Sequence, residues 1–273
     1  MTNLAKVDSS MARLGRNIVR IDDPDAPIYR WFQLPHFWSM IEDRQFMLVP
    51  PGKWEDPFED FPRHCMVDYE GSPHRIHTLD SVIDPVYAQC WSMTEESDAL
   101  WRAYSRVVKQ GGISNTCPDE EGVQVRTTPR KLLQVMWKWC PDNPAKSCFI
   151  GKVRYLNQQE VVRHIDEVLR GQLDEVSTGV SRAELVLFKR SGFSHEAEVR
   201  LVYVRPRTDD SPPNTIAIPF NPDRVFDQVS FDPRLEEFES DDRKKKAKQL
   251  GFNGSFGGCE LYDHIRWIVT KPI

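Results

Sequence analysis

The sequence predicts an α+β protein with a mixed or antiparallel sheet flanked by helices. The 273 residues are 40% hydrophobic and 28% charged, which is typical of a globular chain long enough for a real core. Alternating apolar residues predict strands, and apolar residues at helical spacing behind capping residues predict helices. These strands and helices follow one another without a regular β-α-β rhythm, which favours a mixed or antiparallel sheet over a parallel one.

The elements are expected in the following order. Strands are expected over residues 28–32, 46–49, 86–93, 122–126, 148–155, 196–204, 216–220, 225–231 and 265–270. Helices are expected after Pro35, from Ser97 to the Gly111-Gly112 pair, after Thr128, from Asn157 to Gly171, and from Ser240 to Gly251. Residues 53–85 are loop-like, and residues 183–189 fit either a helix or a strand.

The domain organisation follows from polarity and from the lack of repeats. Residues 1–26 are polar and have no sustained period, so we expect an N-terminal arm there. No internal repeat and no long linker divides the rest of the sequence. We therefore expect a single α+β domain with catalytic character over residues 27–273.

Composition and charge exclude several classes of protein. Lys and Arg number 36 against 41 Asp and Glu, and the resulting net charge of -5 disfavours a protein that coats nucleic acid, although a local basic groove stays open. No apolar run reaches the roughly 18 residues that span a bilayer, and the N-terminus lacks the apolar segment of a secretory signal. The six cysteines show no metal-ligand spacing and are expected to be reduced. We expect a cytoplasmic protein with no bound metal and no membrane contact.

Residues 196–204 (EAEVRLVYV) carry the most informative pattern. In a strand, alternation puts Glu196, Glu198 and Arg200 on one face and apolar side chains on the other. Two carboxylates about 7 Å apart on a rigid strand suit catalysis. One can stabilise a developing cation while the other orients or deprotonates an attacking group. An edge strand with a solvated charged face is the alternative interpretation.

Several motifs follow one another along the chain. They are residues 28–30 (IYR), 54–59 (WEDPFE), 90–94 (CWSMT), 100–104 (LWRAY), Lys189 and 194–202 (SHEAEVRLV). In order and spacing this set, over about residues 28–250, resembles the bacterial and phage domain-of-unknown-function family 2971. The sequence departs from the family pattern at Glu55, where the family has asparagine, and at residues 102–103, where it has histidine.

A second resemblance concerns function. The order of Arg30, then Ser92 with Thr94, then Glu196 and Glu198 resembles the three-part signature of ADP-ribosyltransferases of the Arg-Ser-Glu type. The resemblance implies a split sheet and NAD as the substrate. It also implies that Arg30 contacts NAD and that Ser92 and Thr94 support the catalytic glutamate. Glu198 would be that glutamate, and Glu196 would be the carboxylate on the acceptor side.

The residue types suit this chemistry. Breaking the bond between nicotinamide and ribose builds positive charge on the ribose, which a carboxylate can stabilise. An arginine can bind the pyrophosphate with a bidentate fork. Further NAD contacts are expected from Tyr29, Trp101 and Tyr104, which can stack on a base, and from Lys189, which can meet a phosphate. Trp101 and Tyr104 are three residues apart on a helix, so core packing is the alternative for at least one of them.

Three functions stay open. The first is an NAD-dependent ADP-ribosyltransferase or NAD glycohydrolase whose acceptor is a protein, a nucleic acid or water. Such an enzyme would be a bacterial toxin or anti-phage effector, and its partner would be an antitoxin or a defence protein. The second is a non-catalytic partner-binding domain with a degenerate cleft. The third is a metal-dependent nuclease that uses Glu196, Glu198 and either Asp56 or Asp84. The first requires Arg30, Ser92 and Glu198 to meet around one cleft.

Overall fold

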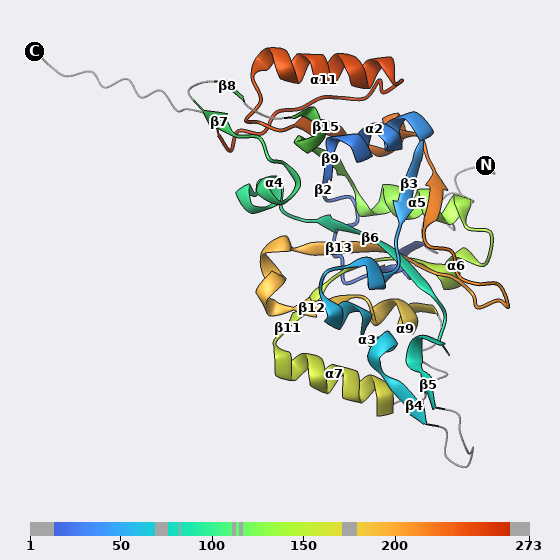
Figure 1. Cartoon of the computed structure of the whole chain (residues 1–273). Coiled ribbons are helices and arrows are strands. Elements are labelled where there is room, and N and C mark those ends of the chain that lie inside the picture. Colours follow the sequence, from blue (N-terminus) through green and yellow to red (C-terminus); the bar gives the residue numbers. More distant parts are fainter. Residues whose placement is uncertain are drawn as a thin grey trace, which may run out of the picture. The chain divides into compact units, whose positions relative to one another are not determined.

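The computed structural model describes residues 14–68, 76–81, 83–110, 113–114, 117–170 and 179–262 (Figure 1). The chain folds into two compact units. Unit 1 consists of Met1–Arg30, Arg44–Thr94 and Thr127–Asn221, and unit 2 consists of Trp31–Asp43, Glu95–Arg126 and Pro222–Ile273. The predicted arm over residues 1–26 and the predicted single domain over residues 27–273 stay predictions, and residues 1–13 of the arm lie outside the described residues.

Unit 1 is built on a mixed sheet. Its strands lie in the order β1-β10-β13-β6-β2. They are β1 (Ile18–Val19), β2 (Ile28–Gln33, of which the first three residues belong to unit 1), β6 (Val86–Ser92), β10 (Cys148–Lys152) and β13 (Glu198–Val204). The pairing of β1 with β10 is parallel, and the other pairings are antiparallel.

Helices lie on both faces of this sheet. They are α3 (Phe61–His64), α5 (Pro129–Trp139), α6 (Pro144–Ser147), α7 (Gln158–Arg170) and α9 (Gly179–Glu184). In Figure 1, α3, α7 and α9 lie below the central strands β6 and β13, and α5 lies above them. The helices α5 and α7 begin where the sequence predicts, because Thr128 and Asn157 accept hydrogen bonds from the N–H groups of Lys131 and Glu160. The predicted α+β class, with a mixed sheet flanked by helices, is confirmed.

Short elements fill the connections of unit 1. Three strand pairs are β3 (Gln45–Leu48) with β14 (Ile216–Pro219), β4 (Met66–Asp68) with β5 (Ile76–Thr78), and β11 (Arg154–Leu156) with β12 (Phe188–Arg190). The 3-10 turns are η1 (Pro51–Lys53), η2 (Pro57–Asp60), η3 (Leu79–Ser81) and η5 (Ser191–Glu196). Residues 53–85 therefore hold more structure than a loop. The ambiguous residues 183–189 form the end of α9, a turn and the start of β12.

Two predicted strands of unit 1 differ from the observed ones. The strand predicted over residues 148–155 is interrupted at Val153, whose N–H donates to the Glu198 carbonyl at 2.9 Å. The strand predicted over residues 196–204 begins at Glu198, because Ala197 adopts a left-handed conformation with φ of 44°. A residue with positive φ does not continue a β-ladder, so Glu196 ends η5 instead of starting the strand.

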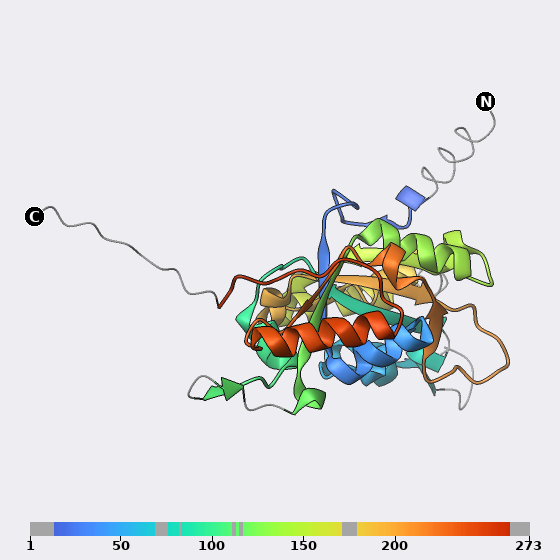
Figure 2. The same cartoon turned by 90° about the horizontal axis from the view of Figure 1, so that it is seen from above.

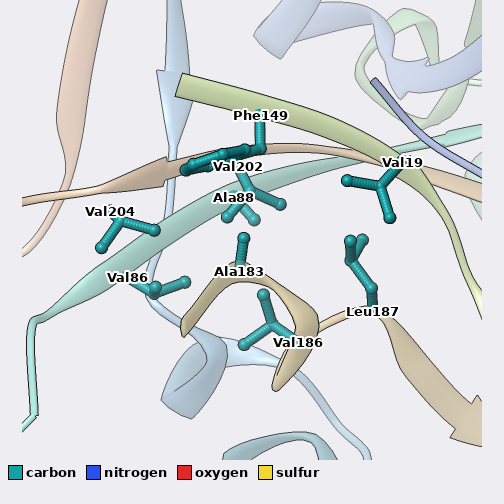
Figure 3. Close-up of a cluster of buried hydrophobic side chains, with 9 residues drawn as sticks. All are labelled: Val19, Val86, Ala88, Phe149, Ala183, Val186, Leu187, Val202 and Val204. Atoms are coloured by element: carbon teal, nitrogen blue, oxygen red, sulfur yellow. The ribbon is translucent and has the colours of Figure 1, made fainter. Parts of the chain in front are cut away.

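One face of the sheet holds an apolar cluster (Figure 3). Its nine side chains are Val19, Val86, Ala88, Phe149, Ala183, Val186, Leu187, Val202 and Val204. They come from β1, β6, β10, β13, α9 and the turn after α9. Alternation along β6 and β13 then brings Cys90 opposite Arg200 and Ser92 opposite Glu198 on this same face. The buried face is thus apolar at one end of the two strands and charged at the other.

Unit 2 has its own strand pair and helices. The strands β9 (Gly122–Thr127) and β15 (Gln228–Phe231) are antiparallel, and the short strands β7 (Lys109–Gln110) and β8 (Ile113–Ser114) pair with each other. The helical segments are α2 (Leu34–Asp43), α4 (Asp98–Tyr104), η4 (Pro118–Glu120), α10 (Pro222–Val225) and α11 (Glu237–Gln249). Figure 2 shows α11 beside α2, and the Lys246 Nζ lies 4.8 Å from the centre of the Trp38 ring.

Three expectations for unit 2 need correction. The helix predicted up to Gly111-Gly112 ends at Tyr104, because Ser105 takes an extended conformation, and the two glycines lie outside the described residues. The helix predicted from Ser240 begins at Glu237, because Glu236 and Glu239 form a capping box. The strand predicted over residues 225–231 is shorter because α10 ends at Val225. The strand predicted over residues 265–270 lies outside the described residues.

No helix in the described part of the chain combines the length and the apolar character that crossing a membrane requires.

Candidate functional site

Three neighbouring strands of unit 1 bring predicted site residues into register. Tyr29 of β2 lies opposite Ser92 of β6, and Ser92 lies opposite Glu198 of β13. Residues opposite each other in neighbouring strands point to the same face of a sheet. The side chains of Tyr29, Ser92 and Glu198 therefore share one face, and all three residues are buried.

Arg30 contacts the same strands in a different way. It follows Tyr29 in β2, so alternation directs its side chain away from the face of Ser92 and Glu198. Its Nη1 donates a hydrogen bond to the backbone carbonyl of Cys90 in β6. Burial raises the pKa of the Cys90 thiol to about 12, and the positive charges of Arg200 and Arg30 oppose that rise. Arg30 thus lies against β6, two residues before Ser92, and donates to the backbone there.

Ser92 holds the turn that precedes β13. Its Oγ donates to the Glu196 carbonyl at 2.6 Å and accepts from the Thr94 N–H at 3.0 Å. The Met93 N–H also donates to the Ala197 carbonyl at 2.9 Å. The resemblance assigns Ser92 and Thr94 to support of a glutamate side chain. In the structure the Ser92 hydroxyl fixes the backbone between the two glutamates, and Thr94 contributes its N–H to that hydroxyl.

The two carboxylates meet one ammonium group. The Lys189 Nζ lies 2.6 Å from Glu196 Oε2 and 3.5 Å from Glu198 Oε1. Lys189 is in β12, and its Nζ also lies 4.6 Å from the centre of the Phe193 ring in η5. Lys189, predicted to contact a phosphate, is therefore the cation that balances both carboxylates.

Arg200 is the second cation of this cluster, and it is fully buried. Its Nε donates to Glu198 Oε2 at 2.8 Å, and its Nη1 donates to the Val186 carbonyl at 2.8 Å. Its Nη2 donates both to Glu198 Oε2 and to Glu59 Oε1. Its Cζ lies 4.4 Å from the centre of the Trp54 ring. The alternative interpretation, a solvated charged face, is therefore wrong: this face is enclosed, and each buried charge of the cluster is paired.

The charges in this cluster shift one another's pKa values. Burial raises the pKa of Glu198, but the positive charges of Arg200 and Lys189 outweigh it, so the pKa lies below its usual range. Burial dominates for Glu196 and for Glu59, and the pKa of each is raised. Burial would lower the pKa of Lys189, but the carboxylate of Glu198 and the bond to Glu196 raise it. Glu198 and Lys189 are therefore charged at neutral pH.

Exposure separates the two predicted catalytic carboxylates. The Glu196 side chain is 22% exposed, whereas the Glu198 side chain is 8% exposed. Glu196 is therefore the one that solvent or a bound molecule reaches more easily. The Glu198 N–H donates to the Tyr155 hydroxyl at 2.7 Å, and burial raises the pKa of Tyr155 to about 12.

Sequence reasoning missed four contributors to this site: Trp54, Glu59, Tyr155 and Arg200. Trp54 and Glu59 lie in the WEDPFE motif, so the motif itself was a signal for them. Arg200 alternates with Glu198 along β13, which was a signal for a shared face. No signal in the sequence pointed to Tyr155, because its contact depends on where β11 packs.

Two further predicted residues belong to unit 2. Trp101 in α4 is fully buried, and its ring packs edge-on against Trp31 with centroids 6.1 Å apart. Core packing, the alternative for this position, therefore describes Trp101 better than stacking on a ligand. Tyr104, at the end of the same helix, is 40% exposed.

The nuclease alternative finds no support. Among the residues that the structure describes, no group of three or more His, Cys, Asp or Glu side chains could hold a metal ion. Asp56 pairs with Arg190 at 3.1 Å, and an Asp84 oxygen accepts from the Arg207 N–H at 3.1 Å. Each acid that a metal centre would need is thus engaged with the protein's own donors.

No protein-family model matches the chain, and no curated protein matches its sequence. Among solved structures it is similar to Thermus sp. 2.9 DarT in complex with ADP-ribosylated ssDNA, with NAD+ and with carba-NAD+. In that order the TM-scores are 0.36, 0.37 and 0.35, and the sequence identity is 11% in each case. The matches cover 87%, 87% and 88% of this chain and 96%, 97% and 98% of those chains.

These TM-scores are too low to establish a shared fold, so the fold and the site rest on the chain's own geometry. Membership of family 2971 and the likeness to ADP-ribosyltransferases stay predictions.

Proposed function

We propose that this chain is an NAD-dependent ADP-ribosyltransferase-like enzyme. It transfers ADP-ribose from NAD to a protein or nucleic-acid acceptor, or to water. The observation that carries the proposal is the register of Tyr29, Ser92 and Glu198 across β2, β6 and β13. That register supports a single site built from residues far apart in the chain. It unites Ser92 and Glu198 of the predicted signature with Tyr29, whereas the side chain of Arg30, the arginine of the signature, lies on the opposite face of the sheet.

The state of Glu198 supports this chemistry. Loss of nicotinamide leaves positive charge on the ribose, and an ionised carboxylate stabilises that charge. The lowered pKa keeps Glu198 ionised at neutral pH. Its Oε2 accepts from Arg200, whereas the contact of its Oε1 with Lys189 is long at 3.5 Å. Oε1 therefore keeps acceptor capacity for a ribose hydroxyl.

The remaining roles follow from exposure and contacts. Glu196, the more exposed carboxylate, is the group that orients or deprotonates the acceptor. Tyr29 binds NAD from the face that carries Glu198, whereas Arg30 supports β6 through its bond to the Cys90 carbonyl. Lys189 balances the two carboxylates and needs no contact with phosphate.

We further propose a cytoplasmic toxin or anti-phage effector that acts with an antitoxin or defence partner. Six cysteines without a disulfide among them support a reducing compartment. The resemblance to a bacterial and phage family supports the biological setting.

The decisive experiment follows nicotinamide release from labelled NAD by the wild type, Glu198→Gln and Glu196→Gln. We expect release by the wild type and a loss of about 100-fold or more with Glu198→Gln, because one charge-stabilising group is removed. Glu196→Gln reduces transfer to the acceptor more than it reduces nicotinamide release. Circular dichroism at the assay temperature checks that each variant is folded. Equal release by all three proteins removes the proposal.

The partner-binding alternative is favoured by one observation. Glu198 and Arg200 are buried and paired with each other, as in a cluster that only supports a fold. A non-catalytic domain would show no thermal shift with NAD, whereas an NAD-binding enzyme is stabilised by its ligand. Under this alternative, Arg30 and Glu198 variants that stay folded would also keep the full toxic or anti-phage effect of the wild type in cells.

A further inference from the structure

The WEDPFE segment, residues 54–59, is tied to the strand that carries Lys189. Asp56 caps η2 by accepting from the Phe58 N–H at 3.0 Å. Its carboxylate also forms a fork with the next residue of β12, in which Arg190 Nε and Nη2 each lie 3.1 Å from an Asp56 oxygen. The Arg190 Cζ lies 4.9 Å from the centre of the Phe58 ring. These contacts hold the segment in one place beside the charged cluster.

The segment ends at a buried carboxylate that reaches the catalytic one through Arg200. The Glu59 side chain is 4% exposed, and its Oε1 accepts from Nη2 of Arg200. The same Nη2 donates to Glu198 Oε2. Trp54, at the other end of the segment, covers the guanidinium with its ring. Arg200 is therefore held between the WEDPFE segment and β13.

We propose that Glu59 is a positioning residue for the Glu198 carboxylate. By accepting from Nη2 it fixes the Arg200 guanidinium, and the guanidinium fixes Oε2 of Glu198 so that Oε1 faces Lys189. This inference rests on the proposed function, in which Glu198 stabilises the ribose cation. The role explains why the segment carries a carboxylate at this buried position.

Energetics favour a role beyond stability. Burying an ion pair is costly, and an apolar replacement of similar volume is often as stable or more stable. A cluster with three carboxylates and two cations is therefore a poor way to fill space. It is a good way to hold one carboxylate ionised and oriented, since both cations of the cluster reach Glu198.

The charge balance gives a direct consequence. The groups that face Glu198 are Glu59, Cys90, Tyr155, Lys189, Glu196 and Arg200. Glu198 has a lowered pKa and Glu59 a raised one, so Glu59 is already protonated in the pH range where Glu198 titrates. Glu59→Gln keeps an oxygen that accepts from Arg200 and matches that uncharged form. Glu59→Leu removes the acceptor, so the guanidinium is held less firmly against Glu198 and the pKa of Glu198 rises toward its usual range.

The experiment compares Glu59→Gln and Glu59→Leu with a control, Leu79→Ala, in the full-length protein. Leu79 is fully buried in the neighbouring cluster of Phe61, Ile83 and Phe188 and has no part in the charged site. Two readouts are used. The first is kcat and KM for nicotinamide release across pH. The second is the titration of the Glu198 carboxyl carbon by NMR, assigned by its loss in Glu198→Gln.

We expect Glu59→Gln to keep KM within about twofold and to leave the Glu198 titration midpoint unchanged, whereas Glu59→Leu raises that midpoint by about half a pH unit or more. Glu59→Leu lowers kcat by about tenfold or more at nearly constant KM, because the carboxylate is displaced. Leu79→Ala lowers the melting temperature but keeps kcat per folded molecule. The proposal is overturned if Glu59→Leu leaves the Glu198 titration unchanged, or if Glu59→Leu loses no more kcat per folded molecule than Leu79→Ala.

The two proposals fail in different ways. A folded wild type that releases no nicotinamide refutes the proposed function. The NMR titration does not depend on NAD, so it still decides whether Glu59 controls the state of Glu198.

Discussion

Arg200 is the residue at which the buried charges of unit 1 converge. Its guanidinium donates to two carboxylates and a backbone carbonyl and lies under the Trp54 ring. A buried charge is tolerated only when its partners satisfy it, and removal of one partner leaves the others uncompensated. Substitutions in this cluster should therefore lower the free energy of unfolding as well as the activity.

The two glutamates should differ in their effect on stability. Glu198→Gln removes the charge that both Arg200 and Lys189 face, and we expect a loss of about 3 kcal/mol in the free energy of unfolding. Glu196→Gln affects a more exposed carboxylate whose pKa is raised, so its charge adds little stability at pH 7, and we expect a loss well below about 1 kcal/mol. Urea unfolding at pH 7 measures both losses. Equal losses would contradict the burial difference between the two side chains.

The pH dependence of the free energy of unfolding should show that the pKa of Glu59 is raised in the folded protein. Burial raises its pKa in the folded protein above the ordinary value of 4.5. Between 4.5 and the raised pKa, the folded state holds a proton that the unfolded state has released. The stability contributed by Glu59 is therefore present at lower pH and is lost as the pH rises through that window.

Melting temperatures of the wild type and Glu59→Gln from pH 4 to pH 8 test this expectation. The wild type should lose stability relative to the variant as the pH rises above 4.5. Glu196 also has a raised pKa but is present in both proteins, so the comparison isolates Glu59. A constant difference across the range would show that the pKa of Glu59 is not raised.

At the scale of elements, the turn between η5 and β13 decides where the two carboxylates lie. Ala197 has φ of 44° and ψ of 51°, and the Ser92 hydroxyl binds the carbonyl just before it. The turn separates Glu196, which stays partly exposed, from Glu198, which enters the buried face. A regular strand would have kept both side chains on one face at fixed spacing.

The left-handed conformation at Ala197 gives a testable consequence. We expect Ala197→Gly to stabilise the protein by about 0.5 kcal/mol, since glycine adopts positive φ without strain but loses more chain entropy. Ala197→Val should destabilise it by about 1 kcal/mol or more, because a β-branched residue fits this region poorly. Thermal unfolding measures both changes. Equal stability of the glycine and valine variants would refute the conformation of this turn.

At the scale of the whole molecule, each of the two units has a core of its own. Unit 1 buries the apolar cluster of β6, β13 and α9 (Figure 3), and unit 2 buries aromatic residues of α2, α4 and β15, including Phe37, Trp101 and Phe231. The candidate site described above lies within unit 1. Its geometry therefore depends on the folding of unit 1.

Thiol labelling gives a readout of the whole folded chain. Cys117 is exposed, whereas Cys148 is a buried free thiol. The pKa of Cys148 is raised mainly by a side-chain hydrogen bond with the Cys140 thiol and further by burial. The thiolate is the reactive form, so Cys117 should label with iodoacetamide in the native state. Cys148 should label only in denaturant. Mass spectrometry of both states checks this, and native labelling of Cys148 at the rate of Cys117 would contradict the buried position of β10.

Much of the fold could be predicted because its signals are local. Thr128 before Pro129, the Asn157 cap and the alternation after Glu198 each depend on neighbours within a few residues. Some errors had a local cause, such as the capping box of Glu236 and Glu239 that starts α11 early. The others occurred where a distant contact overrides the local pattern. The strand start at Glu196 gave way to a turn held by Ser92. The strand through Val153 ended because Val153 makes the last bond to β13, and the next residue, Arg154, donates to the Leu187 carbonyl where β11 pairs with β12.

The sequence by itself determined the α+β class and most element positions and pointed to the pair Glu196 and Glu198, because spacing and residue type are sufficient for these, whereas Ser92 entered through the resemblance to the Arg-Ser-Glu signature. Only the tertiary structure decided that the charged face of β13 is enclosed, that Arg30 donates to a strand backbone, and that Glu59 shares a guanidinium with Glu198. The physical reason is that burial and pairing depend on segments far apart in the chain, 60 residues for Arg30 and Cys90 and 141 for Glu59 and Arg200, and no local pattern records which of them meet.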